Sequence, residues 1–203
     1  MHVISTRSMS KWAVMAVAVA TFSGCASFYV DTALPDVKSS EIKKPASPKP
    51  VQLSFAFQTK GAPNEAATKM LKGQVTELVQ GSGLFSKVSE SGEAAVIKVT
   101  LNNIPITQDA FSKGFMTGFT FGLAGSTVTD GYVCTVDYTP AAGGARITEE
   151  AKHAIHTGLG AGSAPPNIKP AASLEEAVRT MTRQIVNSAL KKLGDEPRFA
   201  DAP

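Results

Sequence analysis

Two histidines and two glutamates are the side chains whose spacing comes nearest to acid–base or metal chemistry. His153 and His156 lie three residues apart, and Glu149 and Glu150 are adjacent to each other just upstream. The alternation of apolar and polar residues around them predicts a β-strand, in which successive side chains point to opposite faces. Both pairs should therefore divide between the two faces, which argues against a shared metal ion and against a paired-carboxylate mechanism. We expect no metal site.

Nucleophilic catalysis needs a serine or cysteine beside a positioned base, and the sequence offers no such arrangement. The G-x-S-x-G pattern of a nucleophile elbow does not occur. Residues 158–163 are glycine-rich like a phosphate-binding loop, but Pro165 and Pro166 stand near where a lysine and a hydroxyl residue would be required. The sequence therefore predicts no catalytic residue, no cofactor and a protein that is not an enzyme.

Length and charge narrow the range of partners. The chain has 203 residues, and its 20 Lys and Arg nearly balance its 17 Asp and Glu. This length fits one domain, or one domain with a tail. A balanced charge gives no strongly basic surface for a phosphate backbone, so nucleic acid is not an expected partner.

The N-terminal residues have the layout of an export signal. Residues 1–24 contain Arg7 and Lys11 and no acidic residue, and the eleven residues of 12–22 carry no charge. That run is too short to cross a bilayer, which takes about 20 residues. We expect residues 1–24 to be a signal peptide that is removed.

The end of this signal, Ser23-Gly24-Cys25, resembles the bacterial lipobox. The resemblance implies cleavage before Cys25 and attachment of fatty chains such as palmitate to it, which would anchor the domain stably to a membrane on the periplasmic side. Phe22 departs from the family pattern, which prefers Leu or another aliphatic residue there. Ala26 stands where an Asp would argue for inner-membrane retention, which favours the outer membrane. An ordinary secretory signal with a chance cysteine and an uncleaved anchor are the alternatives.

Residues 25–50 are expected to form the lipidated cysteine and a flexible tether. They contain four prolines and four lysines and show no sustained apolar periodicity. If Cys25 carries lipid, Cys134 has no partner within the chain. Its strand-like surroundings favour burial over pairing between chains.

Residues 51–194 are expected to form a single α+β domain, followed by a disordered tail over 195–203. The predicted order is β-α-β-β-β-β-α: a mostly antiparallel four- to five-stranded sheet with two amphipathic helices on one face. Ser173 and Glu176 form a capping box at the start of the second helix, and Gly194 is expected to end it. The strands are expected over 51–58, 84–89, 94–101, 131–138 and 145–157, and the helices over about 67–78 and 173–193.

This element order, together with the lipobox, resembles the small α+β fold of the lipopolysaccharide-assembly lipoprotein and of the amino-terminal domain of TolB. The resemblance covers about Val51 to Leu193 and includes no diagnostic motif. It implies a fold and does not imply a function.

The segment Phe111–Val128 is unusually apolar and rich in glycine. Sixteen residues between Lys113 and Asp130 carry no charge. As a helix they would cover only about 24 Å, short of a bilayer core. They form either a glycine-rich strand or loop packed on the sheet, or an exposed element that docks onto lipid or protein. The candidate docking residues are Phe115, Phe119, Phe121 and Leu123.

Together these features predict a non-enzymatic, lipid-anchored periplasmic module of the bacterial cell envelope that binds a protein partner or itself. Its attachment to the membrane would be through acyl chains on Cys25. The alternative is a carrier or sensor of a lipid or small apolar ligand held between helices and sheet. A hydrolase would need a polar triad that the sequence does not assemble.

Overall fold

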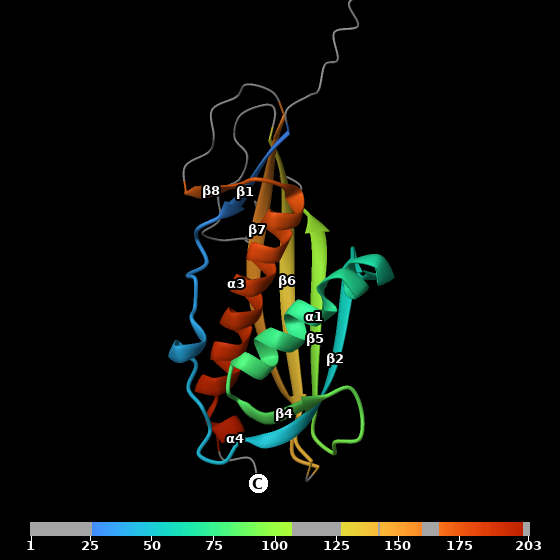
Figure 1. Cartoon of the computed structure of the whole chain (residues 1–203), viewed down its shortest axis with the longest axis vertical. Helices are drawn as coiled ribbons and strands as arrows, with labels where there is room; N and C mark the ends of the chain where they lie inside the picture. The colour runs from blue at the N-terminus through green and yellow to red at the C-terminus, as the bar shows by residue number, and fades with distance from the viewer. Residues whose placement is uncertain (1–25, 107–126, 142, 160–166, 201–203) are drawn as a thin grey trace, which may run out of the picture.

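The computed structural model describes residues 26–106, 127–141, 143–159 and 167–200 as an eight-stranded sheet with two long helices on one face (Figure 1). The predicted α+β class is confirmed. The strands are β1 (Ala26–Asp31), β2 (Lys49–Thr59), β3 (Ala62–Pro63), β4 (Phe85–Ser89), β5 (Val96–Pro105), β6 (Thr127–Thr139), β7 (Ile147–Leu159) and β8 (Ile168–Ala171). The helices are α1 (Glu65–Gly81), α3 (Leu174–Asp195) and the short α4 (Pro197–Ala200), and a 3-10 turn spans Ser39–Glu41.

The strand order across the sheet is β3-β2-β5-β6-β7-β1-β8, with β4 paired to β2. β2 runs parallel to β5 and to β4, and all the other pairs are antiparallel. The sheet is therefore mostly antiparallel, as predicted. It has more strands than the four or five expected, because β1, β3 and β8 were not anticipated.

The core lies between the sheet and the two long helices. The expected apolar face of β2 is confirmed: Val51 and Phe57 are buried, and Leu53 and Phe55 pack against the same core. Buried side chains of the two helices and of the central strands complete it, among them Leu71, Val75, Ile97, Leu101, Val136, Met181 and Ile185. In the described part of the chain, no helix combines the length and apolarity needed to cross a bilayer.

Side-chain caps fix where both long helices begin. The Asn64 side chain accepts a hydrogen bond from the backbone N–H of Ala67 at 3.0 Å. The Ser173 hydroxyl accepts one from the N–H of Glu176 at 3.1 Å, and the Glu176 carboxylate accepts one from the N–H of Ala172 at 2.8 Å. The predicted cap at Ser173 is therefore confirmed, and each such cap stabilises its helix by about 1 kcal/mol.

The expected flexible tether over residues 25–50 is wrong for the described part of that range. β1 lies inside the sheet, antiparallel to β7 on one side and to β8 on the other. The chain then runs along α3 (Figure 1), where Asp36 forms a bidentate ion pair with Arg183 and the Val37 carbonyl accepts a hydrogen bond from Asn187. The prolines and lysines of this stretch suggested solvation, whereas a few apolar side chains such as the buried Ile42 fix it to the core.

The C-terminal expectations also need correction. α3 continues through Gly194 to Asp195, and a Cβ at position 194 would stand 2.5 Å from the Lys43 carbonyl oxygen. Gly194 therefore does not end the helix. Its missing side chain lets the segment around Lys43 pack closely against α3. Within the expected tail, Phe199 is buried in α4, with its ring centroid 5.0 Å from that of Tyr138 and 5.7 Å from that of Phe85. Edge-to-face aromatic contacts of this kind hold α4 against the domain.

Candidate functional site

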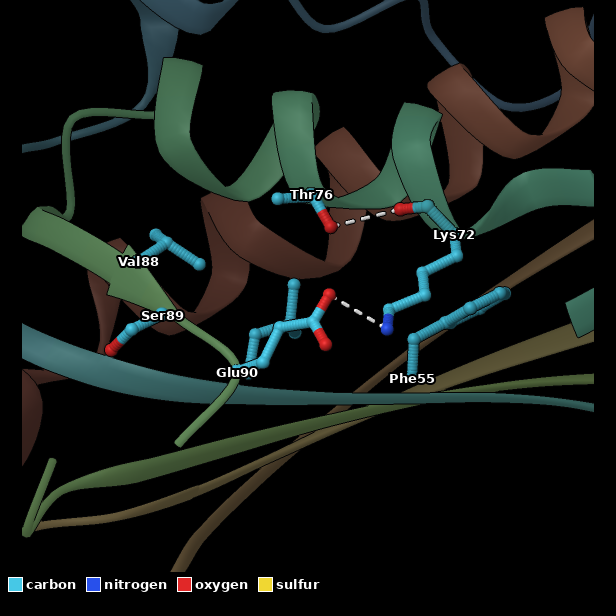
Figure 2. A pocket seen from close by; sticks show the side chains of 7 residues that line it. Phe55, Lys72, Thr76, Val88, Ser89 and Glu90 are labelled. Atoms are coloured by element: carbon cyan, nitrogen blue, oxygen red, sulfur yellow. Dashed lines mark hydrogen bonds and ion pairs between the residues drawn. The ribbon is translucent and has the colours of Figure 1, made fainter. Parts of the chain in front are cut away.

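A pocket opens between α1, β2 and β4 (Figure 2). It has a volume of about 150 Å³ and is open to solvent. Two lining side chains come from the helix-facing side of β2, two from α1, and three from the end of β4 and the residue that follows it. These are Leu53, Phe55, Lys72, Thr76, Val88, Ser89 and Glu90. The floor is apolar, and the charged groups lie toward the solvent.

An exposed ion pair spans the mouth of this pocket. The Lys72 ammonium lies 2.7 Å from a Glu90 carboxylate oxygen, and the two side chains are 49% and 75% exposed. A pair this exposed contributes less than about 1 kcal/mol. The nearby hydroxyls are already engaged, since Thr76 donates to the Lys72 carbonyl at 2.9 Å and Ser89 donates to Glu93 at 3.1 Å. The pair can therefore separate at little cost when another molecule occupies the pocket.

Among the residues that the structure describes, no strand pairs with the outer edge of β2 beside this pocket. β4 pairs with β2 only up to Gln52, and β3 pairs with it only from Gln58. The N–H of Gln52 points to β5, where it donates to the Ala95 carbonyl at 2.9 Å. Because the backbone groups of successive strand residues alternate in direction, those of Phe55 point to the outer edge. The side chain of this same residue lines the pocket.

The ends of this open stretch are closed by the protein itself. The N–H of Phe57 donates to the Thr68 hydroxyl at 2.8 Å, and the Phe57 carbonyl accepts from Asn64 at 2.9 Å. Toward the other end, β4 already pairs with Val51 and Gln52. The unpaired edge is thus short and centred on Phe55.

A second group of polar side chains lies on the sheet face opposite the helices. Nδ1 of His156 lies 2.9 Å from the Thr129 hydroxyl, and Nε2 lies 3.0 Å from an Asp31 carboxylate oxygen. This chain of contacts links β6, β7 and β1. The hydroxyl–imidazole–carboxylate order resembles a nucleophile–base–acid arrangement. However, the side chains of His156 and Asp31 have no exposed surface, and their contacts join three neighbouring strands.

His153 lies on the opposite face of β7 from His156, as predicted. Its Nδ1 accepts a hydrogen bond from the Ala154 N–H at 2.8 Å, so Nε2 carries the proton and donates to the Gln184 side-chain oxygen in α3, also at 2.8 Å. Burial lowers the pKa of His153, which keeps the imidazole neutral. Among the residues that the structure describes, no cluster of three or more potential ligands could hold a metal ion.

Cys134 is buried in β6 and forms no disulfide. Burial, with a smaller contribution from Glu150, raises the pKa of its thiol to about 12. A protonated, enclosed thiol is unreactive, so the interpretation as a core residue holds and pairing between chains is not supported.

The lipidation candidate Cys25 and the docking candidates lie outside the described residues, but the residues next to them are placed. β1 begins at Ala26, directly after Cys25, and Ala26 pairs with Leu159 at the end of β7. At this same end of the sheet β5 finishes at Pro105 and β6 begins at Thr127, the two strands that flank the docking candidates. The candidate residues not described are Cys25, Phe115, Phe119, Phe121 and Leu123.

Comparisons with solved structures find distant likenesses in shape. A minor lipoprotein from Acinetobacter baumannii has 13% sequence identity and a TM-score of 0.35, over 75% of this chain and 93% of that one. A dodecamer of a PelC variant from Paraburkholderia phytofirmans has 10% identity and a TM-score of 0.33, over 73% and 88%. A homologue of neuraminyllactose-binding hemagglutinin from Helicobacter pylori has 10% identity and a TM-score of 0.38, over 79% and 94%.

No protein-family model and no curated protein sequence matches the chain.

Proposed function

We propose that this protein is a non-enzymatic lipoprotein of the bacterial cell envelope, anchored in the outer membrane by acyl chains on Cys25, whose periplasmic domain binds a protein partner. The observation that carries the proposal is the export signal that ends in Ser23-Gly24-Cys25. The likeness to the lipopolysaccharide-assembly lipoprotein and to TolB is part of the same proposal.

The placement of β1 supports a membrane-facing end of the domain. Because β1 starts at Ala26, an anchor on Cys25 would hold that end of the sheet close to the lipid surface. The boundaries of the apolar segment, Pro105 and Thr127, lie at this end as well. The acyl chains on Cys25 and the apolar segment 111–128 would then both be attached at this end of the sheet, where both could contact the membrane.

The arrangement of polar groups supports a binding role rather than catalysis. In the described part of the chain, the hydroxyl–imidazole–carboxylate group is enclosed, while the accessible pocket is floored by apolar side chains. Reactive side chains in an enzyme need access to the substrate, whereas a binding module needs accessible apolar and backbone groups.

Mass analysis of the mature protein tests the anchor. We expect cleavage before Cys25 and a mass increase from two or three acyl chains, together with recovery in the outer-membrane fraction. Cys25→Ser should abolish the mass increase and release the protein from that fraction, with Cys134→Ser as the matched control that changes neither. An unmodified Cys25 thiol, or a leader still attached, would contradict the proposal.

A carrier of a small apolar ligand is the second candidate function, and the pocket between α1, β2 and β4 favours it. Like small-molecule sites in general, it is concave and lined largely by apolar side chains, although its volume of about 150 Å³ suits only a small apolar group. Extraction of the purified protein followed by mass spectrometry distinguishes the two functions. A carrier should release a stoichiometric lipid or small molecule, whereas a protein-binding module should yield crosslinked protein partners in its envelope and no such molecule.

A further inference from the structure

We propose that the open edge of β2 between β3 and β4 takes up an extended peptide of the partner as an added strand, with one large apolar side chain of that peptide seated in the pocket beside Phe55. This rests on the proposed protein-binding function and specifies its site.

The backbone determines the class of ligand. The N–H and carbonyl of Phe55 point outward along an edge where neither β3 nor β4 continues. A donor and an acceptor at strand spacing match the main chain of another extended peptide, which presents the complementary groups at the same spacing. A hydrocarbon chain offers neither group, so the edge favours a peptide over a lipid.

The length of the gap limits the peptide. Strand pairing on this side of β2 stops at Gln52 and resumes at Gln58, and Thr68 and Asn64 already engage the backbone of Phe57, which leaves residues 53–56 uncovered. At about 3.3 Å per residue these four positions span about 13 Å. A stretch of three or four peptide residues fits there, and it would lie in line with β4, which pairs with the preceding residues of β2.

The pocket gives the added strand its specificity. Side chains of a strand alternate between faces, so alternate residues of the peptide would point to the helix side of the sheet, where the pocket lies. Leu53, Phe55 and Val88 form apolar walls there (Figure 2), which suit a Leu, Met or Phe side chain. The residues on either side of that anchor would face away from the pocket.

The charges at the mouth explain how the edge stays free in the absence of a peptide. Lys72 and Glu90 pair with each other across the opening and are largely exposed. Charged side chains at a strand edge discourage indiscriminate pairing with other chains. An entering peptide has to displace this weak pair, and its own charged groups can then contact Lys72 or Glu90.

A displayed library of random seven-residue peptides, selected on the full-length protein in detergent, tests the proposal. We expect enriched peptides to share one large apolar residue. A synthetic copy should slow amide hydrogen exchange at Phe55 at least about tenfold. Methylation of the peptide backbone nitrogens that face β2 should weaken binding about tenfold or more, because it removes the main-chain donors.

Two substitutions in α1 provide a matched pair of variants. Thr76→Trp places a large side chain in the pocket and should weaken peptide binding at least about tenfold, whereas Met70→Trp, at an exposed position on another face of α1, should leave it unchanged. Melting temperatures of both variants verify that they fold. Failure to enrich any peptide, indifference to backbone methylation, or equal binding by the two variants would overturn the proposal.

Crosslinking in the native envelope separates failure of the site from failure of the function. If the wild-type protein captures a partner and Thr76→Trp captures it equally well, the proposed function stands and the β2 site is wrong. If wild type captures no protein partner but releases a lipid or small molecule on extraction, the protein-binding function itself is wrong.

Discussion

Two pairs of an acidic and a basic side chain, one near β1 and one near β2, have similar distances between their charged atoms. One pair is buried and the other is exposed to solvent. On the β1 side, Asp31 and His156 lie 3.0 Å apart with no exposed surface. On the β2 side, Lys72 and Glu90 lie 2.7 Å apart and largely in solvent. Breaking a buried pair leaves a desolvated polar group, whereas an exposed pair simply exchanges its contact for water. Burial therefore makes the first pair costly to break, whereas the second can separate at little cost.

Loss of the buried pair should have the largest effect. We expect Asp31→Ala to lower the free energy of unfolding by about 3 kcal/mol or more, because His156 and the Ala33 N–H both lose their hydrogen-bond partner. Urea titration measures the change. Asp36→Ala, which removes the exposed ion pair with Arg183 and a contact with Gln184, is the control and should cost less than about 1 kcal/mol. Equal losses in the two variants would mean that burial is not what distinguishes the pairs.

Glycine substitutions in the two long helices sharpen the same contrast. Gly194→Ala should cost about 1 to 3 kcal/mol, because the new methyl group would meet the Lys43 carbonyl oxygen at 2.5 Å. Gly73→Ala in α1 has no atom within 4 Å of the new Cβ and should stabilise the protein by about 0.5 to 1 kcal/mol through its helix propensity. Thermal unfolding of both variants measures the difference. If Gly194→Ala leaves the stability unchanged, the segment around Lys43 can move away from α3 at little cost.

The buried side should also respond to acid. Burial lowers the pKa of His153 below its usual value near 6.5, so the unfolded chain binds more protons than the folded one as the pH falls below about 6.5. The contribution of neutral His153 to the free energy of unfolding is fully retained above that pH. It declines below that pH by at most about 1.4 kcal/mol per pH unit. Unfolding titrations between pH 7.5 and 5 should show this decline, and His153→Gln should reduce it. If the free energy of unfolding of His153→Gln falls with pH as steeply as that of the wild type, other groups cause the acid sensitivity.

The smallest effect is expected at the pocket mouth. Lys72→Gln should change the free energy of unfolding by less than about 1 kcal/mol, because its partner Glu90 is 75% exposed. The coupling between Lys72→Gln and Glu90→Gln, measured by a double-mutant cycle at low salt, should be small and should vanish at 1 M salt. A coupling above about 2 kcal/mol would place this pair in the same class as the buried one.

Local patterns in the sequence predicted the elements whose cause is local. The alternation in β2, the apolar stripes of α1 and α3, the cap at Ser173 and the division of His153 and His156 between faces all depend on residues a few positions apart. Each of these predictions is confirmed.

The features that the sequence did not reveal depend on partners far along the chain. Ala26 pairs with Leu159, and Asp31 meets His156 across 125 positions, so no local signal indicates where β1 pairs or that Asp31 is buried. The pocket depends on where β4 stops along β2, which short-range periodicity does not determine. The prolines and lysines of residues 25–50 therefore predicted a solvated tether, although β1 within this range is part of the sheet.

The position of β1 also constrains the order in which the domain can assemble. β1 precedes the other described strands in the sequence, yet its neighbours are Ile147–Leu159 and Ile168–Ala171, the last two of those strands. Until those residues are available, the opening strand has no ladder to join, and its apolar side chains need protection. Such late, non-local closure makes folding slow. A nascent chain that leaves the ribosome or a membrane channel N-terminus first would therefore keep β1 unpaired until β7 and β8 have followed.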